Sequence, residues 1–298
     1  MNAEQPSGPP EPTEAALPAD AVSPPDDAND LRGFHFKLLL GKVLTWVLIG
    51  AFVIAGGIAG AVLVGPIIGA AAAVGIFLVG ILIVFGIADS RAEDSFFQTY
   101  ATQRGMSLTG RQVLPPATPL LRRGDDRYAE RTLTGPLADG IEGVLALYTY
   151  EEETTDSKGN QQTNYYRYTL GMLDVPESAA RVPELYCQRK SGLRALEKFE
   201  DAFRGSKQRV TFESEDLLDR YEIFANENQD QNWLRQIFSP TFIVWLTESG
   251  LPDKFAFELV NGTLCCYANG HKKKAEDLDR MSAAAAAVAT RLREESLE

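Results

Sequence analysis

A long uncharged segment constrains this chain more than any other feature. From Val43 to Ala88 no residue carries a charge. An α-helix rises about 1.5 Å per residue, so about 20 residues cross the hydrocarbon core of a bilayer, and this segment can cross it about twice. Pro66 lies near its middle, and proline removes an internal helical hydrogen bond. We therefore expect an α-helical transmembrane hairpin with spans at residues 43–64 and 67–88.

Two other interpretations of the apolar segment are disfavoured. The core of a soluble protein does not contain two adjacent uninterrupted helices of this length. A signal peptide has a short apolar region near the N-terminus and a cleavage site, whereas this segment begins late and is too long. The segment also lacks ionisable residues, which argues against ion transport or a proton relay within it.

The positive charges that flank the spans predict their orientation. Such residues lie before the first span and after the second, and none lies in the turn: Arg32, Lys37, Lys42, Arg91 and Arg104. Because positive residues stay on the cytoplasmic side, we expect a two-pass protein of the plasma membrane with both termini in the cytoplasm. The chain has three cysteines, two of them adjacent, which is not a disulfide framework and fits a reducing compartment.

Small residues recur at helical spacing in both predicted spans. Gly56 and Gly60 form one GxxxG pair, and Gly65 and Gly69 form another. Such pairs let helix backbones approach closely. Two alternatives stay open: packing within the hairpin, or self-association of two copies through these four glycines.

The segments that flank the spans have distinct compositions. Residues 1–30 hold seven prolines among scattered acidic residues, and we expect them to be disordered. Residues 31–42 mix Phe and Leu with Lys and Arg, which predicts a juxtamembrane segment at the lipid interface. After the second span, residues 89–105 are expected to continue as a juxtamembrane helix that stops near Gly105. The lipid bilayer is therefore one expected partner.

Residues 106–298 have the composition of a water-soluble domain, which we expect to be α+β with antiparallel strands and packed helices. Residues 144–150 and 165–173 are rich in aliphatic and aromatic side chains, as strands are, and the polar residues between them predict a long hairpin loop over 151–164. The order of elements allows two similar halves, each with its own small sheet, at residues 142–175 and 209–298.

Helical spacing and capping residues predict several helices in this domain. We expect helices over residues 192–203, 230–238 and 275–295, and another that begins at Pro240 with Ser239 as its N-cap. The basic residues Lys272–Lys274 before the last helix are either its solvated first turn or a contact for anionic lipid. The last helix either packs on the sheet or mediates oligomerisation.

The dipeptide Asn261-Gly262 is the clearest local signal, because it favours the tight turn of a two-residue hairpin. This turn pairs Val260 with Thr263 and places Cys265 and Cys266 on opposite faces of their strand. The two thiols therefore cannot easily bind one metal ion, and we assign them, like Cys187, a structural role. With His271 as the only histidine of the domain, we identify no metal, cofactor or catalytic residue.

No catalytic motif stands out in the sequence. It contains no glycine-rich phosphate loop, nucleophile elbow or HExxH motif. An enzyme would have to use carboxylates such as Asp125, Asp126 or Glu222. The net charge of −12 disfavours nucleic-acid binding, which needs a basic surface.

Three features occur in an order that suggests a family resemblance. After the two-helix anchor, Glu142-Gly143-Val144 opens a hairpin that ends in the aromatic residues 165–168. Residues 220–225 then precede a helix and the segment 238–242. Together these resemble a family of uncharacterised bacterial two-helix membrane proteins that carry a cytoplasmic domain of unknown function. The resemblance covers about residues 40–295, although residues 226–228 replace the acidic turn usual in that family. It implies a bacterial inner-membrane location, and it brings no known activity and no site residues.

These features predict a membrane-anchored cytoplasmic interaction module whose protein partner is unknown. The alternatives are a membrane-associated enzyme that uses carboxylates and a small oligomeric transport subunit.

Overall fold

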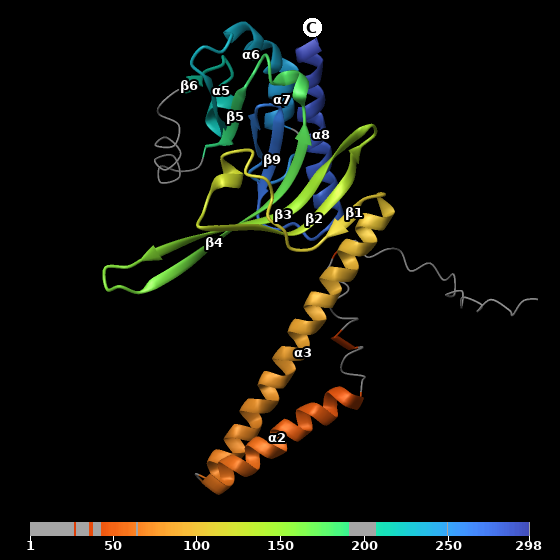
Figure 1. Cartoon of the computed structure of the whole chain (residues 1–298), viewed down its shortest axis with the longest axis vertical. Coiled ribbons are helices and arrows are strands. Elements are labelled where there is room, and N and C mark those ends of the chain that lie inside the picture. Colours follow the sequence, from red (N-terminus) through yellow and green to blue (C-terminus); the bar gives the residue numbers. More distant parts are fainter. Residues whose placement is uncertain are drawn as a thin grey trace, which may run out of the picture.

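The computed structural model describes residues 27, 36–37, 43–63, 65–190, 207–248 and 250–297. Figure 1 shows a pair of long N-terminal helices that leads into an α+β body built around one sheet. The predicted disordered tail and juxtamembrane segment fall almost wholly outside the described residues, and the predicted helix at 192–203 falls wholly outside them.

The first two described helices form the predicted hairpin. Helix α2 spans Val43–Leu63, and helix α3 spans Pro66–Gln103. Both are long and apolar enough to cross a membrane. The expected second span and the expected juxtamembrane helix are one continuous helix, because no helix-breaking residue separates them. This helix ends at Gln103, and Gly105 follows with a φ of 65°, as the sequence predicted.

Glycines let α2 and α3 approach each other closely. A Cβ atom on Gly60 would lie 3.0 Å from the Cα of Gly69, and one on Gly69 would lie 2.6 Å from the backbone nitrogen of Ala61. Gly56 likewise faces α3, whereas a Cβ on Gly65 would meet open space. These contacts support packing within the hairpin, and self-association through the four glycines stays a prediction.

The described strands form a single nine-stranded antiparallel sheet in the order β1-β2-β3-β4-β9-β8-β5-β7-β6. The strands are β1 (Ser107–Thr109), β2 (Asp126–Ala138), β3 (Ile141–Thr155), β4 (Gln161–Asp174), β5 (Glu184–Arg189), β6 (Lys207–Val210), β7 (Tyr221–Asn226), β8 (Ala256–Val260) and β9 (Thr263–Asn269). The antiparallel α+β prediction is confirmed. The structure shows one sheet instead of two separate ones, and it does not show two similar halves.

Helices pack beside and across this sheet. The described ones are η1 (Leu120–Arg122), η2 (Pro176–Ser178), α5 (Glu215–Arg220), α6 (Gln231–Ile237), α7 (Pro240–Glu248) and α8 (Ala275–Leu297). Asp230 caps α6 by accepting the N–H of Asn232, and Ser239 caps α7 by accepting the N–H of Phe242. The predicted helices that lie within the described residues are therefore confirmed.

Strands β3 and β4 are longer than the sequence predicted. Residues 151–164 were expected to be a loop, but the strands pair as far as Thr155 opposite Gln161, and only residues 156–160 form the turn. Cross-strand pairs and β-branched threonines stabilise the polar strand ends. The carboxylate of Asp156 closes the turn by accepting the N–H groups of Lys158 and Asn160, at 2.8 and 2.9 Å.

This extension projects from the body as a two-stranded arm, visible in Figure 1 beyond the label β4. β2 begins with Asp126 opposite Glu151, and β9 ends with Asn269 opposite Tyr168. Residues 152–167 therefore extend beyond both neighbouring strands. We call these residues the arm.

Two hydrophobic clusters cover the two faces of the sheet. On one face, Phe96, Phe97 and Tyr100 of α3 share a cluster with Leu278 and Met281 of α8. The last turns of α3 therefore contribute side chains to the core of the domain, whose start the sequence predicted at residue 106. On the other face lies a second cluster, which includes Leu120 and Leu121. They belong to residues 110–125, which we call the strap because this segment lies across the sheet.

Candidate functional site

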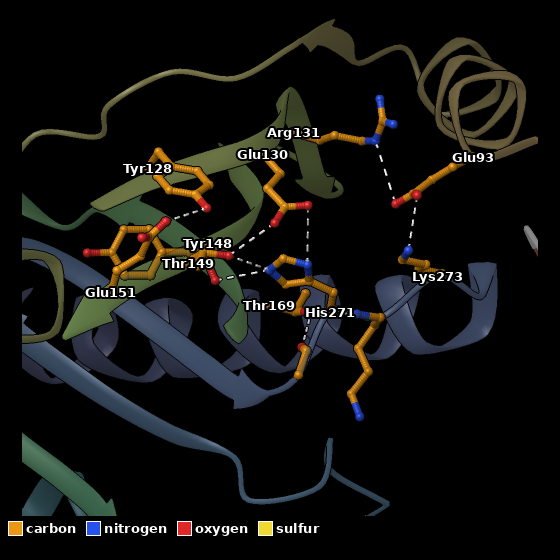
Figure 2. A network of polar contacts seen from close by, with 12 residues as sticks. Glu93, Tyr128, Glu130, Arg131, Tyr148, Thr149, Glu151, Thr169, His271 and Lys273 are labelled. Carbon is orange, nitrogen blue, oxygen red and sulfur yellow. Dashed lines mark hydrogen bonds and ion pairs between the residues drawn. The ribbon is translucent and has the colours of Figure 1, made fainter. Parts of the chain in front are cut away.

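The junction between α3 and the domain holds most of the polar contacts that could serve a function (Figure 2). Glu93 of α3 lies 3.8 Å from Arg131 Nε of β2 and 3.0 Å from Lys273 Nζ, just before α8. Asp94 lies 2.7 Å from Arg131 Nη1. Ion pairs thus join the first polar turns of α3 to two parts of the sheet domain.

A second group of contacts fixes the end of α3. The hydroxyl of Tyr100 donates to Asp279 Oδ1 of α8 at 2.8 Å, and Arg104 Nε donates to the same oxygen at 2.6 Å. The Arg104 guanidinium also lies 3.9 Å from the centre of the Tyr100 ring. Burial raises the pKa of the Tyr100 hydroxyl, so that it stays a hydrogen-bond donor at neutral pH.

A pocket with a volume of about 370 Å³ adjoins this second group, where α3, α8 and the turn between β2 and β3 meet. Its charged lining residues are Arg104, Asp279 and Asp139. Arg104 and Asp279 neutralise each other, and Asp139 is exposed at the turn. The pocket is therefore part of the α3–α8 contact and offers no converging catalytic groups.

His271 lies at the centre of the junction and brings together a hydroxyl and a carboxylate. Its Nε2 lies 3.2 Å from the hydroxyl oxygen of Thr149, and its Nδ1 lies 3.6 Å from Glu130 Oε2. The Thr149 hydroxyl also donates to Glu130 Oε1 at 3.2 Å. The residue types and their order are those of a hydroxyl–imidazole–carboxylate triad.

The geometry around His271 disfavours nucleophilic catalysis. Nε2 also lies 3.1 Å from the carbonyl oxygen of Tyr148, which can only accept a hydrogen bond. Nε2 must therefore carry the proton and cannot remove one from Thr149. Thr149 is moreover fully buried. Burial lowers the pKa of His271, and the Glu130 carboxylate opposes this shift. The cluster is therefore a structural cross-link.

The connection from β9 to α8 is held in the same network. The buried hydroxyl of Thr169 donates to the carbonyl of Gly270 at 2.8 Å and accepts the N–H of Lys272 at 2.9 Å. His271 and Lys273 therefore present their side chains from a fixed backbone, one toward β2 and β3 and the other toward α3. The sequence singled out His271 but could not identify Thr149 or Glu130, because only the sheet brings them together.

The cysteines lie where the sequence predicted. Cys265 pairs with Glu258 and Cys266 with Phe257, so the adjacent thiols face opposite sides of the sheet. Cys187, Cys265 and Cys266 are fully buried, and burial raises the pKa of each thiol. Within the described ranges, no group of three or more His, Cys, Asp and Glu residues could hold a metal ion.

The carboxylates that an enzyme would have used do not converge. Asp125 accepts the N–H of Glu153 at 2.8 Å, and Asp126 lies 3.7 Å from Arg111. Glu222 of β7 lies 3.2 Å from Arg209, and five strands separate β7 from β2 in the sheet. Each carboxylate thus has a local structural partner.

Glu258 is a buried carboxyl group whose environment the sequence did not reveal. Its Oε2 accepts the N–H of Leu120 in the strap at 2.9 Å, and its Oε1 has no hydrogen-bond partner in the described part of the chain. Burial raises its pKa. The strap covers this face of β8, and Glu258 helps to hold the strap in place.

The Thr149–His271–Glu130 cluster does not identify a catalytic reaction. The other polar groups of the junction do not identify one either. Comparison with known protein families, with curated proteins and with solved structures finds no match to this chain. The resemblance to the two-helix membrane family stays a prediction.

Proposed function

We propose that this chain is a membrane-anchored interaction module. α2 and the apolar part of α3 cross the membrane, and the α+β domain binds a partner at its surface. The observation that carries this proposal is the continuity of α3, which runs unbroken from an uncharged segment into the core of the domain. Phe96 follows Asp89, the first charged residue after the uncharged segment, by two turns or about 11 Å.

The junction supports a fixed placement of the domain relative to the membrane. A flexible linker would let the domain move freely, whereas α3 is packed into the hydrophobic core and held by the ion pairs of Glu93 and Asp94. The domain therefore keeps one height and one orientation at the lipid surface.

The charges near the spans support an orientation with both termini in the cytoplasm. Positive residues such as Lys37 and Arg91 flank the hairpin, and its turn at Gly65 and Pro66 has none. The resemblance to the two-helix membrane family supports the plasma membrane of a bacterium.

The arm supports a role in binding. In the described part of the chain, no arm residue belongs to a hydrophobic cluster, so the arm adds little to the core. It contacts the strap through Glu153, whose N–H donates to Asp125. Tyr165 is 52% exposed on it. A long projecting hairpin that contributes little to the core is typical of a binding element placed by a rigid scaffold.

Alkaline carbonate extraction tests the anchor. The full-length protein should remain in the membrane pellet, and fusions at both termini should be fluorescent with GFP and inactive with alkaline phosphatase. Release of the protein by carbonate, or active phosphatase at either end, would contradict the proposal.

Site-specific photo-crosslinking in native membranes tests the binding role. A photoreactive residue in place of Tyr165 should give a discrete adduct. The same residue in place of Thr290, on the exposed side of α8, should not. If position 165 gives no reproducible adduct, the arm is not a binding element.

A further inference from the structure

We propose that the outer edge of β4 in the arm pairs with the same edge of a second copy of this chain. The two β4 strands then form an antiparallel pair between two protomers that are anchored in the same membrane. This inference names the partner of the interaction module, and it rests on the membrane anchoring proposed above.

Among the described strands, none pairs with the outer edge of β4 in the arm. The N–H of Gly270 donates to the carbonyl of Arg167 at 2.8 Å, and this is where β9 leaves β4. Alternate residues of a strand present their backbone groups to the same side, so those of Tyr165, Thr163 and Gln161 point outward as well. In the described part of the chain, no strand pairs with this side of β4 before Tyr168. The open stretch of residues 161–166 has the usual length of a strand.

The other edge of the arm is partly occupied and carries charge. On β3, the carboxylate of Asp125 accepts the outward N–H of Glu153 at 2.8 Å. The three successive glutamates Glu151–Glu153 add negative charge along this edge. Charged residues of this kind are the usual protection of an exposed strand against pairing. The open stretch of β4 has no charged residue and no proline, so it lacks this protection.

The open stretch is complementary to itself. Two copies that pair antiparallel about Asn164 place Thr163 opposite Tyr165 and Gln162 opposite Tyr166. A β-branched residue beside an aromatic one is a favourable cross-strand pair, and no like charges meet. Such a two-fold contact uses the same surface of both protomers and closes as a dimer.

The anchor favours a second copy as the occupant of this edge. Because α3 is fixed in the domain core, every copy holds its arm at the same height above the membrane. Confinement to one plane also raises the effective concentration of one arm for another. A small strand-to-strand contact can therefore be populated in the membrane.

Cysteine crosslinking of the full-length protein in native membranes tests this pairing. In the proposed register, Asn164 of one copy lies opposite Asn164 of the other, at a Cα distance of about 4.5 Å, which is within reach of a disulfide. The Asn164→Cys variant should give a disulfide-linked dimer when diamide is added. The three native cysteines are fully buried and should give no background.

Thr154→Cys is the matched control. The amide of Asn164 donates to the Thr154 hydroxyl at 3.2 Å, so both substitutions remove the same hydrogen bond of the arm. Thr154 lies on β3, away from the proposed interface. We expect at least tenfold less dimer from Thr154→Cys than from Asn164→Cys.

A second pair of variants blocks one edge at a time. Thr163→Pro removes an N–H that points outward from β4, a position where an edge strand tolerates proline. When Thr163→Pro is combined with Asn164→Cys, the amount of disulfide-linked dimer should fall at least tenfold. Thr155→Pro removes an outward N–H from β3 and should leave the dimer unchanged.

The outcomes separate this inference from the proposed function. Equal crosslinking of the Asn164→Cys and Thr154→Cys variants in carbonate-resistant membranes would overturn the arm-to-arm dimer and leave the anchor intact. A product whose mass differs from twice that of the chain would identify another protein on this edge and would also overturn it. Release of the protein by carbonate would contradict the membrane anchoring itself.

Discussion

Arg104 and Asp279 form a two-point ion pair between the end of α3 and α8. Arg104 Nε lies 2.6 Å from Asp279 Oδ1, and Arg104 Nη2 lies 2.5 Å from Oδ2. The Tyr100 hydroxyl shares Oδ1. One carboxylate on α8 therefore fixes the last turn of α3, which links the orientation of the domain to that of the hairpin.

The Asp279→Ala substitution should lower the free energy of unfolding by about 1 kcal/mol. It removes the acceptor for two donors, one of them charged, but the Asp279 side chain is 47% exposed and solvent screens part of the interaction. Thermal unfolding of the detergent-solubilised full-length protein measures the effect. The control is Glu276→Ala, whose side chain is 81% exposed and pairs with Arg280 one turn along the same helix. An equal effect of both substitutions would show that the α3–α8 pair has no special role.

A soluble fragment should fold if it begins at residue 89 and fail to fold if it begins at residue 105. The longer fragment keeps Phe96, Phe97 and Tyr100, which are buried in the main hydrophobic cluster, whereas the shorter one leaves that cluster open. Size-exclusion chromatography and circular dichroism should show a folded species for the first and aggregation for the second. In the longer fragment, Phe97→Ala should lower the free energy of unfolding by about 3–5 kcal/mol because it creates a cavity in the core. If the fragment from residue 105 folds, α3 is not part of the domain core.

The pair of apolar helices and the last β-hairpin could be predicted from the sequence because local physics determines them. An uncharged segment of this length defines its own helices, whatever follows it. Asn261 and Gly262 have φ values of 49° and 81°, as the predicted tight turn requires, and this turn fixes the observed pairing of β8 with β9.

Other elements could not be predicted because distant residues determine them. β2 was missed because it contains charged residues and Pro136, and bulges interrupt its alternation. Residues 151–164 were expected to be a loop because the strand ends within them are polar on both faces. His271 acquires its partners only when β2 and β3 pair, and Glu258 becomes buried only when the strap crosses the sheet.

The buried imidazole of His271 should make the folded protein less stable in mild acid. Burial lowers the pKa of His271 below the ordinary value of 6.5. At a pH between the lowered pKa of the folded state and 6.5, the unfolded chain therefore binds more protons than the folded one. Stability is therefore fully present above about pH 6.5 and falls as the pH drops toward the folded pKa. The melting temperature should drop less between pH 7.5 and pH 5.5 in the His271→Gln variant than in the natural protein.

Glu130→Gln is the complementary variant for the same site. The charged groups that act on His271 are Glu130 of β2, Arg167 of β4 and Lys273 in its own connection, and Glu130 alone favours the imidazolium. Without this carboxylate the pKa of His271 should fall further, and the loss of stability at pH 5.5 should increase. An unchanged pH dependence in both variants would mean that His271 does not titrate in this range.

The Glu258→Gln substitution should stabilise the protein at alkaline pH. Burial raises the pKa of Glu258 above the ordinary value of 4.5, and the positive charges of Arg123 and Lys207 offset only part of this shift. At a pH between the ordinary pKa and the raised pKa of the folded state, the folded chain binds more protons than the unfolded one. This carboxyl group therefore lowers the free energy of unfolding progressively as the pH rises through the folded pKa. Glutamine cannot ionise, and its carbonyl can still accept the N–H of Leu120. The melting temperature of the variant should exceed that of the natural protein at pH 8, and the difference should shrink toward pH 4.5.

Glu258→Ala should instead destabilise by about 2 kcal/mol or more, because it leaves the N–H of Leu120 without its acceptor and opens a cavity beneath the strap. A difference between Glu258→Gln and the natural protein that does not change with pH would show that Glu258 stays ionised in the fold.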